Sequence, residues 1–366
     1  MNVLYIVGNR PQFVKLAVLH KEMAKYSFIK EFIIHTGQHF TKEMSAIFFE
    51  DLGINIPTIN LNIHSLSHIA LISKTMEVLE REIPKATPDV VIVFGDTNAT
   101  LAGALTAKKL NIPVVHIEAG IRTFDEEMPE ESNRYLTDRV SSINFCCTRL
   151  NEKQLRKEGY MTTIPSKVVF SGDLMLDAYL YFRDQFTKST KLIDSLGLAK
   201  KQYVVATIHR KHNVENVEVL KNIIDSLNKI HQEVPIVCPL HPYTKGVIEK
   251  NNFVCDFKVI PPQGYLEMQT LINYCSYVIT DSGGVQREAF FAKKPLVIIM
   301  DKPFWPEVTH FGGAVFCNDE DDQILNAFEM IKTRRIKSRT TVFGKGNASA
   351  IITKEVIASF RPNKNI

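Results

Sequence analysis

The sequence has few cysteines, no large excess of either charge and no long apolar run. Its six cysteines include no Cys-x-x-Cys pair, and several lie in apolar stretches, so we expect reduced core residues rather than disulfides or a metal site. Its 44 Lys and Arg residues against 40 Asp and Glu leave a net charge of +4, which does not favour nucleic-acid binding. The apolar run 3–7 is too short for a membrane span or a signal peptide. These features predict a cytoplasmic protein without nucleic-acid or membrane partners.

Short apolar runs alternate with amphipathic, helix-period stretches along the whole chain, which predicts βαβ units and parallel sheets. The length of 366 residues favours two domains. A polar segment around residues 183–202 separates two series of strands, so we expect an α/β protein of two doubly wound, Rossmann-like domains facing a cleft. The expected domains are 1–175 and 176–347, with a C-terminal helix in 348–366 packing back on the first. The expected strands are 3–7, 32–35, 90–94, 114–119, 144–148, 168–172, 203–209, 236–241, 258–262, 277–281, 295–300 and 314–316.

Two glycine loops follow predicted strands and begin predicted helices. In the first, Gly8 permits a tight turn and Pro11 suits the first helical turn, with Arg10 and Lys15 close by. In the second, "DSGGVQREAFF", a serine able to cap the helix precedes two glycines. The amide groups at such helix starts attract anions, although a glycine turn needed only for packing would look the same. One loop in each domain favours a diphosphate held between them.

Three acidic residues stand at or near the ends of predicted strands and helices in the first half. Asp96 and Glu118 end two apolar runs, and Glu130 follows Pro129 at the start of a helix-like stretch. Each could be a helix cap or a charge suited to the helix dipole. Glu118, in "VVHIEAG", must be desolvated or paired, and desolvation would raise its pKa and suit it to proton transfer.

Two histidines, His209 and His241, close apolar strands in the second half. Their spacing matches no zinc site. Imidazoles that donate to a phosphate fit this position, and histidines with a purely structural role are the alternative.

The ordered set of these motifs resembles the non-hydrolysing UDP-N-acetylglucosamine 2-epimerase family. The motifs are "GNRPQFVK", "TGQHF", "GDTNATLAGALTAKKLNIPVVHIEAGIRT", "PEESNRYLTD", "TIHRKHNVEN", "PLHP" and "TDSGGVQREA". The resemblance implies a glycosyltransferase-B-like fold and the interconversion of UDP-GlcNAc and UDP-ManNAc, serving bacterial surface polysaccharide synthesis. The reaction would eliminate UDP to give a 2-acetamidoglucal and add it back on the other face, without a redox cofactor or metal. A homodimer is also implied.

The same resemblance assigns roles to individual residues, matched motif by motif. The catalytic candidates are Asp96, Glu118, Glu130 and His209; the UDP-sugar-binding candidates are Arg10, Lys15, His241, Ser282, Gly283, Gly284 and Glu288; and Gln38 and His39 match an effector site for a second UDP-GlcNAc found in some bacterial members.

The sequence departs from the commonest family pattern at two positions. Gln12 replaces a glutamate after "RP", and Trp305 replaces an arginine before a Pro-Glu pair. Other segments look closer to the branch acting on UDP-2,3-diacetamido-2,3-dideoxyglucuronate, whose carboxylate would need a cation such as Arg122 or Lys211. Three further alternatives are a glycosyltransferase of the same architecture, a hydrolysing epimerase that releases free ManNAc and UDP, and a nucleotide-sugar-binding protein without catalysis.

Overall fold

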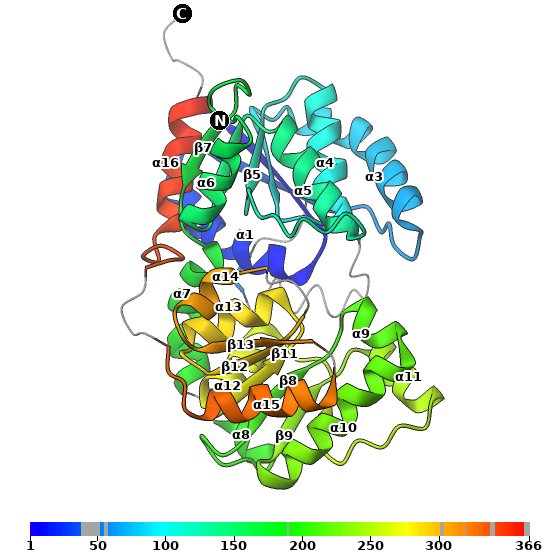
Figure 1. Ribbon diagram of the computed structural model, residues 1–366. Helices are drawn as coiled ribbons and strands as arrows, with labels where there is room; N and C mark the ends of the chain where they lie inside the picture. Colours follow the sequence, from blue (N-terminus) through cyan, green and yellow to red (C-terminus); the bar gives the residue numbers. More distant parts are fainter. Residues whose placement is uncertain are drawn as a thin grey trace, which may run out of the picture. The chain divides into compact units, whose positions relative to one another are not determined.

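The computed structural model describes residues 1–37, 52–54, 58–188, 190–300, 304–318, 320–336 and 341–361 (Figure 1). The chain forms two compact units, of which the first comprises Met1–Leu180 with Thr341–Ile366 and the second Tyr181–Thr340. Each unit is a parallel sheet with helices interleaved along the chain, as predicted. The boundary between the two units at Leu180 and Tyr181 lies inside one helix, α7 (Leu174–Lys188).

The first unit contains a seven-stranded sheet in the order β3-β2-β1-β4-β5-β6-β7. Each neighbouring pair of strands is parallel, as between β1 and β4, where Val3 lies opposite Val90. Every strand predicted in this half is present, and the two-residue β3 is additional because its sequence carries no apolar run. The strands are β1 (Asn2–Val7), β2 (Lys30–His35), β3 (Ile59–Asn60), β4 (Val90–Phe94), β5 (Val114–Ile117), β6 (Ile143–Cys146) and β7 (Lys167–Phe170).

The second unit contains a six-stranded sheet in the order β10-β9-β8-β11-β12-β13. All strands predicted in this half are present. They are β8 (Val204–Thr207), β9 (Ile236–Pro239), β10 (Lys258–Ile260), β11 (Tyr277–Thr280), β12 (Leu296–Ile299) and β13 (Ala314–Cys317). In both sheets the strand order reverses direction beside the first strand of the unit, the arrangement that opens a ligand crevice at the carboxyl ends of the strands.

Helices connect the strands in both units. Those of the first unit are α1 (Arg10–Met23), α3 (His68–Glu82), a 3-10 helix (Ile83–Ala86), α4 (Asn98–Lys109), α5 (Pro129–Val140), α6 (Arg149–Lys157) and α16 (Ala348–Phe360). Those of the second are α8 (Lys191–Ser195), α9 (Lys211–Glu215), α10 (Val217–Glu233), α11 (Pro242–Lys250), α12 (Tyr265–Tyr274), α13 (Gly283–Phe291), α14 (Pro306–His310) and α15 (Asp321–Lys332).

The cores explain why the strands read as continuous apolar runs. All five residues of β4 are buried, since helices cover both faces of a parallel sheet. Helix α4 packs closely on β1 at Gly103, where an added Cβ would lie 2.8 Å from Ile6 Cδ1. In the second unit, α10 and α15 contribute Leu220, Ile324 and other side chains to one core cluster.

The C-terminal helix α16 belongs to the first unit and contacts α1 (Figure 1). Asp177 of α7 accepts hydrogen bonds from the amides of Ala348 and Ser349, at 3.0 and 2.8 Å, and so fixes the first turn of α16. All six cysteines lie in the described part of the chain, and no disulfide joins any of them. Among the described helices, none combines the length and apolar character that crossing a membrane requires.

Candidate functional site

Three neighbouring strands of the first unit end in the polar residues singled out from the sequence. β1 leads to Gly8 and Arg10, β4 to Asp96 and β5 to Glu118. Because β1, β4 and β5 are adjacent and parallel, these loops lie at one edge of the sheet. Arg10 is the first residue of α1, and partial burial lowers the pKa of its guanidinium.

Glu118 is ion-paired to Lys15 of α1 within this edge. Both side chains are largely buried, with 4% of Lys15 and 11% of Glu118 exposed. Glu118 also has φ of 75°, a left-handed conformation that costs a residue with a Cβ of order 1 kcal/mol or more. The charge of Lys15, predicted to lie near a diphosphate, is thus directed at a carboxylate.

Asp96 is held by Arg134 of α5, a residue that sequence reasoning did not select. The Nε and one terminal nitrogen of Arg134 donate to Asp96 Oδ2 at 2.9 and 2.6 Å, and the other terminal nitrogen donates to Glu131 Oε2 at 2.6 Å. Arg134 is 1% exposed, whereas the Asp96 side chain keeps 29% of its surface accessible. The buried Arg134 therefore fixes the orientation of the Asp96 carboxylate, while part of the Asp96 side chain stays accessible.

Of the two acids at the start of α5, Glu131 is the one locked into the structure. It is buried and accepts from the backbone amides of Thr123 and Phe124 as well as from Arg134. Burial opposes its charge, but these donors hold the pKa of Glu131 below its ordinary value. Glu130, the predicted acid, is half-buried in the first turn of the helix.

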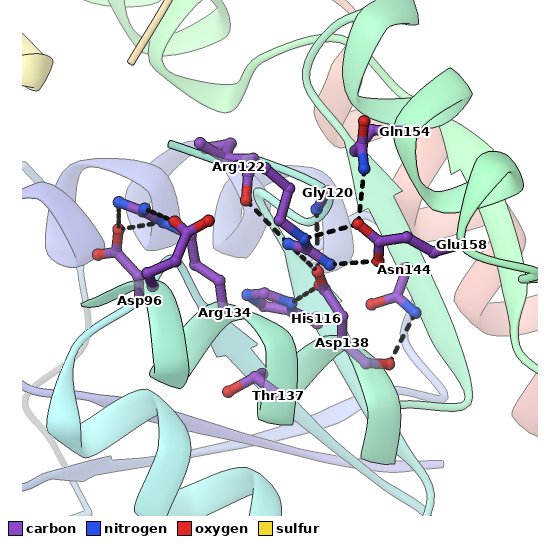
Figure 2. A network of polar contacts seen from close by, with 12 residues as sticks. Asp96, His116, Gly120, Arg122, Arg134, Thr137, Asp138, Asn144, Gln154 and Glu158 are labelled. Atoms are coloured by element: carbon purple, nitrogen blue, oxygen red, sulfur yellow. Dashed lines mark hydrogen bonds and ion pairs between the residues drawn. The ribbon is translucent and has the colours of Figure 1, made fainter. Parts of the chain in front are cut away.

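A buried ionic cluster links the loops after β4 and β5. His116 Nδ1 lies 2.7 Å from Asp138 Oδ1 (Figure 2). The Nε2 of His116 donates to the carbonyl of Gly95 at 2.7 Å. Asp138 also pairs with Arg122 at 2.8 Å. Burial opposes the charge of Asp138, but His116 and Arg122 hold its pKa below the usual carboxyl value.

Arg122 is enclosed by this cluster. Figure 2 shows its guanidinium between Asp138 and Glu158, and its side chain is 0% exposed. Burial opposes the charge of Arg122, but the two carboxylates raise its pKa above the usual value. The sequence suggests Arg122 as a partner for the carboxylate of a uronate substrate, but Asp138 and Glu158 already pair with its guanidinium.

Gln12 ties the loop after β1 to the loop after β4. Its Oε1 accepts from the amide of Gly8 at 2.6 Å, and its Nε2 donates to the carbonyl of Phe94 at 2.7 Å and to Thr100 Oγ1 at 3.0 Å. Gln12 is also the third helical residue of a capping box with Asn9. A glutamate carboxylate here could not donate to the Phe94 carbonyl. The side-chain amide of Gln12 therefore fixes the loop after β1 against the end of β4.

The second unit places its predicted residues in the same way. His209 follows β8, His241 follows β9 and Ser282 follows β11, and these three strands are neighbours in the sheet. His241 caps α11 by accepting from the amide of Tyr243 at 3.2 Å. The three loops therefore lie at one edge of the second sheet.

His209 pairs with Asp281, a residue of the second glycine-loop motif that the sequence alone did not mark as a site residue. His209 Nδ1 lies 2.9 Å from Asp281 Oδ1, while 51% of the histidine side chain is exposed. The Asp281 carboxylate also accepts from the amides of His209 and Arg210, each at 2.9 Å. Asp281 thereby fixes the orientation of the imidazole ring through Nδ1. Histidines that transfer protons through Nε2 are often oriented by a carboxylate in this way.

We expect Asp281→Asn to lower the pKa of His209. Burial opposes the charged imidazole, but the Asp281 carboxylate outweighs it and raises the pKa of His209 above 6.5. In the variant, burial and the nearby charge of Arg210 remain, and both lower the pKa of His209. NMR titration of the His209 ring protons, assigned with His209→Gln, measures the shift; equal titration in both proteins would contradict this account of the dyad.

Ser282, Gly283 and Gly284 form the start of α13, where Ser282 Oγ accepts from the amide of Val285 at 3.4 Å. Trp305 supports this loop from within the unit, because its Nε1 donates to the carbonyl of Gly283 at 3.2 Å. The Arg287 guanidinium of α13 lies 4.4 Å from the Trp305 ring. Trp305 is thus part of the support of the glycine loop.

Glu288, one turn into α13, is buried with 9% exposure.

One group of side chains has donor atoms arranged as in a metal site. Glu118, Cys147 and Asp173 each offer one such atom, and these atoms lie within 4.8 Å of one another. Glu118, however, already contacts the Lys15 ammonium, which supplies positive charge to the group. The structure therefore gives Glu118 a cationic partner from the chain itself.

The two predicted effector residues, Gln38 and His39, lie outside the described residues. The partners that sequence reasoning missed are Arg134, Asp138 and Asp281. Each was visible in a motif used for the resemblance, but its role depends on pairing with a residue of another element, which spacing along the chain does not reveal.

The chain is similar over most of its length to known proteins of one family. The family model "UDP-N-acetylglucosamine 2-epimerase" matches residues 21–357. The UDP-2,3-diacetamido-2,3-dideoxy-D-glucuronate 2-epimerase of Pseudomonas aeruginosa is 42% identical over 97% of this chain and 99% of its own. The UDP-N-acetylglucosamine 2-epimerase of Escherichia coli K12 is 32% identical over 89% of each chain.

A solved structure agrees over nearly the whole length. The Methanocaldococcus jannaschii UDP-GlcNAc 2-epimerase, crystallised in complex with UDP-GlcNAc and UDP, has a TM-score of 0.91 and 35% identity, covering 98% of this chain and 100% of that one. The chain therefore belongs to the UDP-N-acetylglucosamine 2-epimerase family, a family of UDP-sugar isomerases with a glycosyltransferase-B-like fold, as its motifs predicted.

Proposed function

We propose that this protein is a non-hydrolysing UDP-N-acetylglucosamine 2-epimerase that interconverts UDP-GlcNAc and UDP-ManNAc. The observation that carries the proposal is the pair of acids at adjacent strand ends, Asp96 and Glu118, each fixed by a buried cation within a chain of this family. A glycosyltransferase has little use for several acids around one sugar ring, and a binding protein has none.

The reaction proposed has two steps. In the first, the C1–O bond breaks with its electron pair leaving on UDP, a carboxylate takes the C2 proton, and a 2-acetamidoglucal remains. In the second, UDP adds back to C1 while C2 receives a proton on its other face. Nearby carboxylates stabilise the positive charge that develops on the sugar ring. Cations and amide groups stabilise the negative charge of the departing diphosphate.

We propose separate roles for the candidate residues of the two units. In the first, we propose Asp96, Glu118 and Glu130 as the acids that act on the sugar, with Arg10 near the diphosphate. In the second, we propose His209, His241, Ser282, Gly283 and Gly284 for the phosphates, and Glu288 for the ribose hydroxyls, because two carboxylate oxygens can accept from a diol.

The relative with 42% identity is named for a diacetamido uronate, which makes that sugar the competing substrate. A uronate would need a cation at C6, and the guanidinium of Arg122 is enclosed by Asp138 and Glu158. Lys211, the first residue of α9, is exposed and is the cation that a uronate could meet. Of the two cations expected for a uronate carboxylate, only Lys211 has an exposed side chain.

Incubation of the purified protein with UDP-GlcNAc in D2O tests the proposal. We expect UDP-ManNAc and deuterium at C2 of both sugars, with UDP and a 2-acetamidoglucal as minor products. Parallel incubation with the diacetamido uronate distinguishes the two substrates. Steady release of free ManNAc with UDP would indicate a hydrolase, and UDP binding without turnover of either sugar would contradict the epimerase.

We also propose that the enzyme is a cytoplasmic homodimer that serves surface polysaccharide synthesis. The family resemblance supports the dimer, and six cysteines without a disulfide agree with a reducing compartment. Light scattering after size-exclusion chromatography should give twice the chain mass of 41.6 kDa.

A further inference from the structure

The cluster of His116, Asp138 and Arg122 lies behind the proposed catalytic acids without being one of them. His116 and Asp138 are each 0% exposed, so neither reaches a ligand directly. Their contacts run to backbone atoms of the two loops that carry Asp96 and Glu118. The cluster is therefore placed to act on the chemistry through the backbone.

The first of these contacts is at Gly95, immediately before Asp96. Its carbonyl accepts from His116 Nε2 at 2.7 Å, and its amide donates to the carbonyl of Ile117 at 2.8 Å. Gly95 has φ of 65°, so the loop turns sharply here. Both polar groups of the residue before Asp96 are thus bound to β5.

The second contact is at Gly120, two residues after Glu118. Its amide donates to Asp138 Oδ2 at 3.2 Å, and Gly120 has φ of 79°. On the other side, the amides of Glu118 and Ala119 both donate to the carbonyl of Phe145, at 3.1 and 3.0 Å. These bonds hold Glu118 in its left-handed conformation from both sides.

Arg122 completes the cluster by bracing Asp138. Besides its ion pair with Asp138, it donates to both oxygens of Glu158 at 2.9 Å, and Gln154 donates to Glu158 at 2.8 Å (Figure 2). Because Asp138 is fixed from one side by Arg122, its two oxygens have a set position toward His116 and Gly120. A buried carboxylate with several charged donors is a rigid anchor.

We propose that His116 and Asp138 are positioning residues that set the relative placement of Asp96 and Glu118, so that their loss lowers turnover while nucleotide binding persists. This inference rests on the proposed function for the roles of those two acids. Catalytic groups displaced by about 1 Å lose of order 10²-fold in rate, and the hydrogen bonds of His116 and Asp138 to Gly95 and Gly120 act on the two loops that carry those groups.

The principal test is Asp138→Asn, which keeps the shape of the side chain and removes its charge. We expect kcat for UDP-GlcNAc to fall about 10²-fold and the Kd for UDP, measured by calorimetry, to change less than about three-fold. Amide hydrogen exchange should quicken in residues 94–98 and 117–123. His116→Gln, which can still donate to Gly95, is the milder variant and should show the same split between kcat and Kd.

Asp177→Asn is the matched control, because it makes the same change at a buried carboxylate of the first unit that binds α16 instead of the two loops. It should leave kcat nearly unchanged. Equal loss of kcat in the control, or Asp138→Asn and His116→Gln with ordinary kcat and exchange, would overturn the inference. A wild-type protein that turns over neither sugar would overturn the proposed function. Amide hydrogen exchange in the two loops of the variants would still test the positioning role of His116 and Asp138.

Discussion

Glu118→Gln is expected to lose about 10³-fold in kcat for UDP-GlcNAc while keeping its affinity for UDP, because an amide cannot take or return the C2 proton. The variant also leaves the Lys15 ammonium without its carboxylate in a position that is only 4% exposed. Loss of one partner of a buried pair costs about 3 kcal/mol of the free energy of unfolding. Turnover, UDP binding and thermal unfolding are measured on the same preparation, with activity assayed well below the midpoint of unfolding.

Glu355→Gln is the control for the stability effect. Glu355 of α16 pairs with Lys167 at the surface, where the lysine side chain is 49% exposed. Such a pair contributes at most about 1 kcal/mol, so the control should unfold near the wild-type temperature and retain full activity. If Glu118→Gln kept more than about a tenth of the wild-type kcat, Glu118 would have no essential part in the proton transfer.

Arg134→Met is expected to reduce both turnover and stability. Arg134 supplies two hydrogen bonds to Asp96 and one to Glu131, so its loss leaves two carboxylates without their cation. We expect kcat to fall about 10²-fold, because Asp96 loses its orientation, and the free energy of unfolding to fall by about 3 to 5 kcal/mol. Arg134→Lys keeps the charge but not the two-pronged contact with Asp96, so it should recover part of the stability and little of the turnover.

The stability loss in Arg134→Met should depend on pH. The pKa of Glu131 is held below its ordinary value, so Glu131 contributes stability above pH 4.5 that is lost as pH falls through its lowered pKa. Removal of Arg134 reduces this contribution. The difference in unfolding temperature between variant and wild type should therefore be largest near neutral pH and narrow below about pH 4. A difference independent of pH would contradict the role assigned to the Arg134–Glu131 pair.

The strands could be predicted from sequence because both faces of each sheet are covered. Runs such as that of β4, buried at all five positions, are apolar throughout and easy to recognise. β3 pairs with β2 over two residues only, and so short a segment leaves no pattern. The loops rich in glycine and acids were visible for a related reason, since polar residues directly after apolar runs stand out.

The pairing of the site residues could not be predicted in the same way. Glu130 and Glu131 are equivalent in a helix-start motif, and only the packing of α5 determines that Glu131 meets Arg134. Lys15 and Glu118 are far apart in the sequence, and either charge alone suggests contact with a ligand. Gln12 departs from the common family residue, yet its function follows only from the position of the Phe94 carbonyl.

The placement of α16 has a consequence for the order in which the protein is made. The second unit is one continuous stretch, Tyr181–Thr340, whereas the first requires Thr341–Ile366 in addition to Met1–Leu180. During synthesis the second unit has all its residues while the first still lacks the helix that contacts α1 and buries Ile352 and Val356. The ribosome therefore makes the segment that completes the first unit only after the whole of the second unit, and termination before α16 would expose the surface of α1 that α16 contacts.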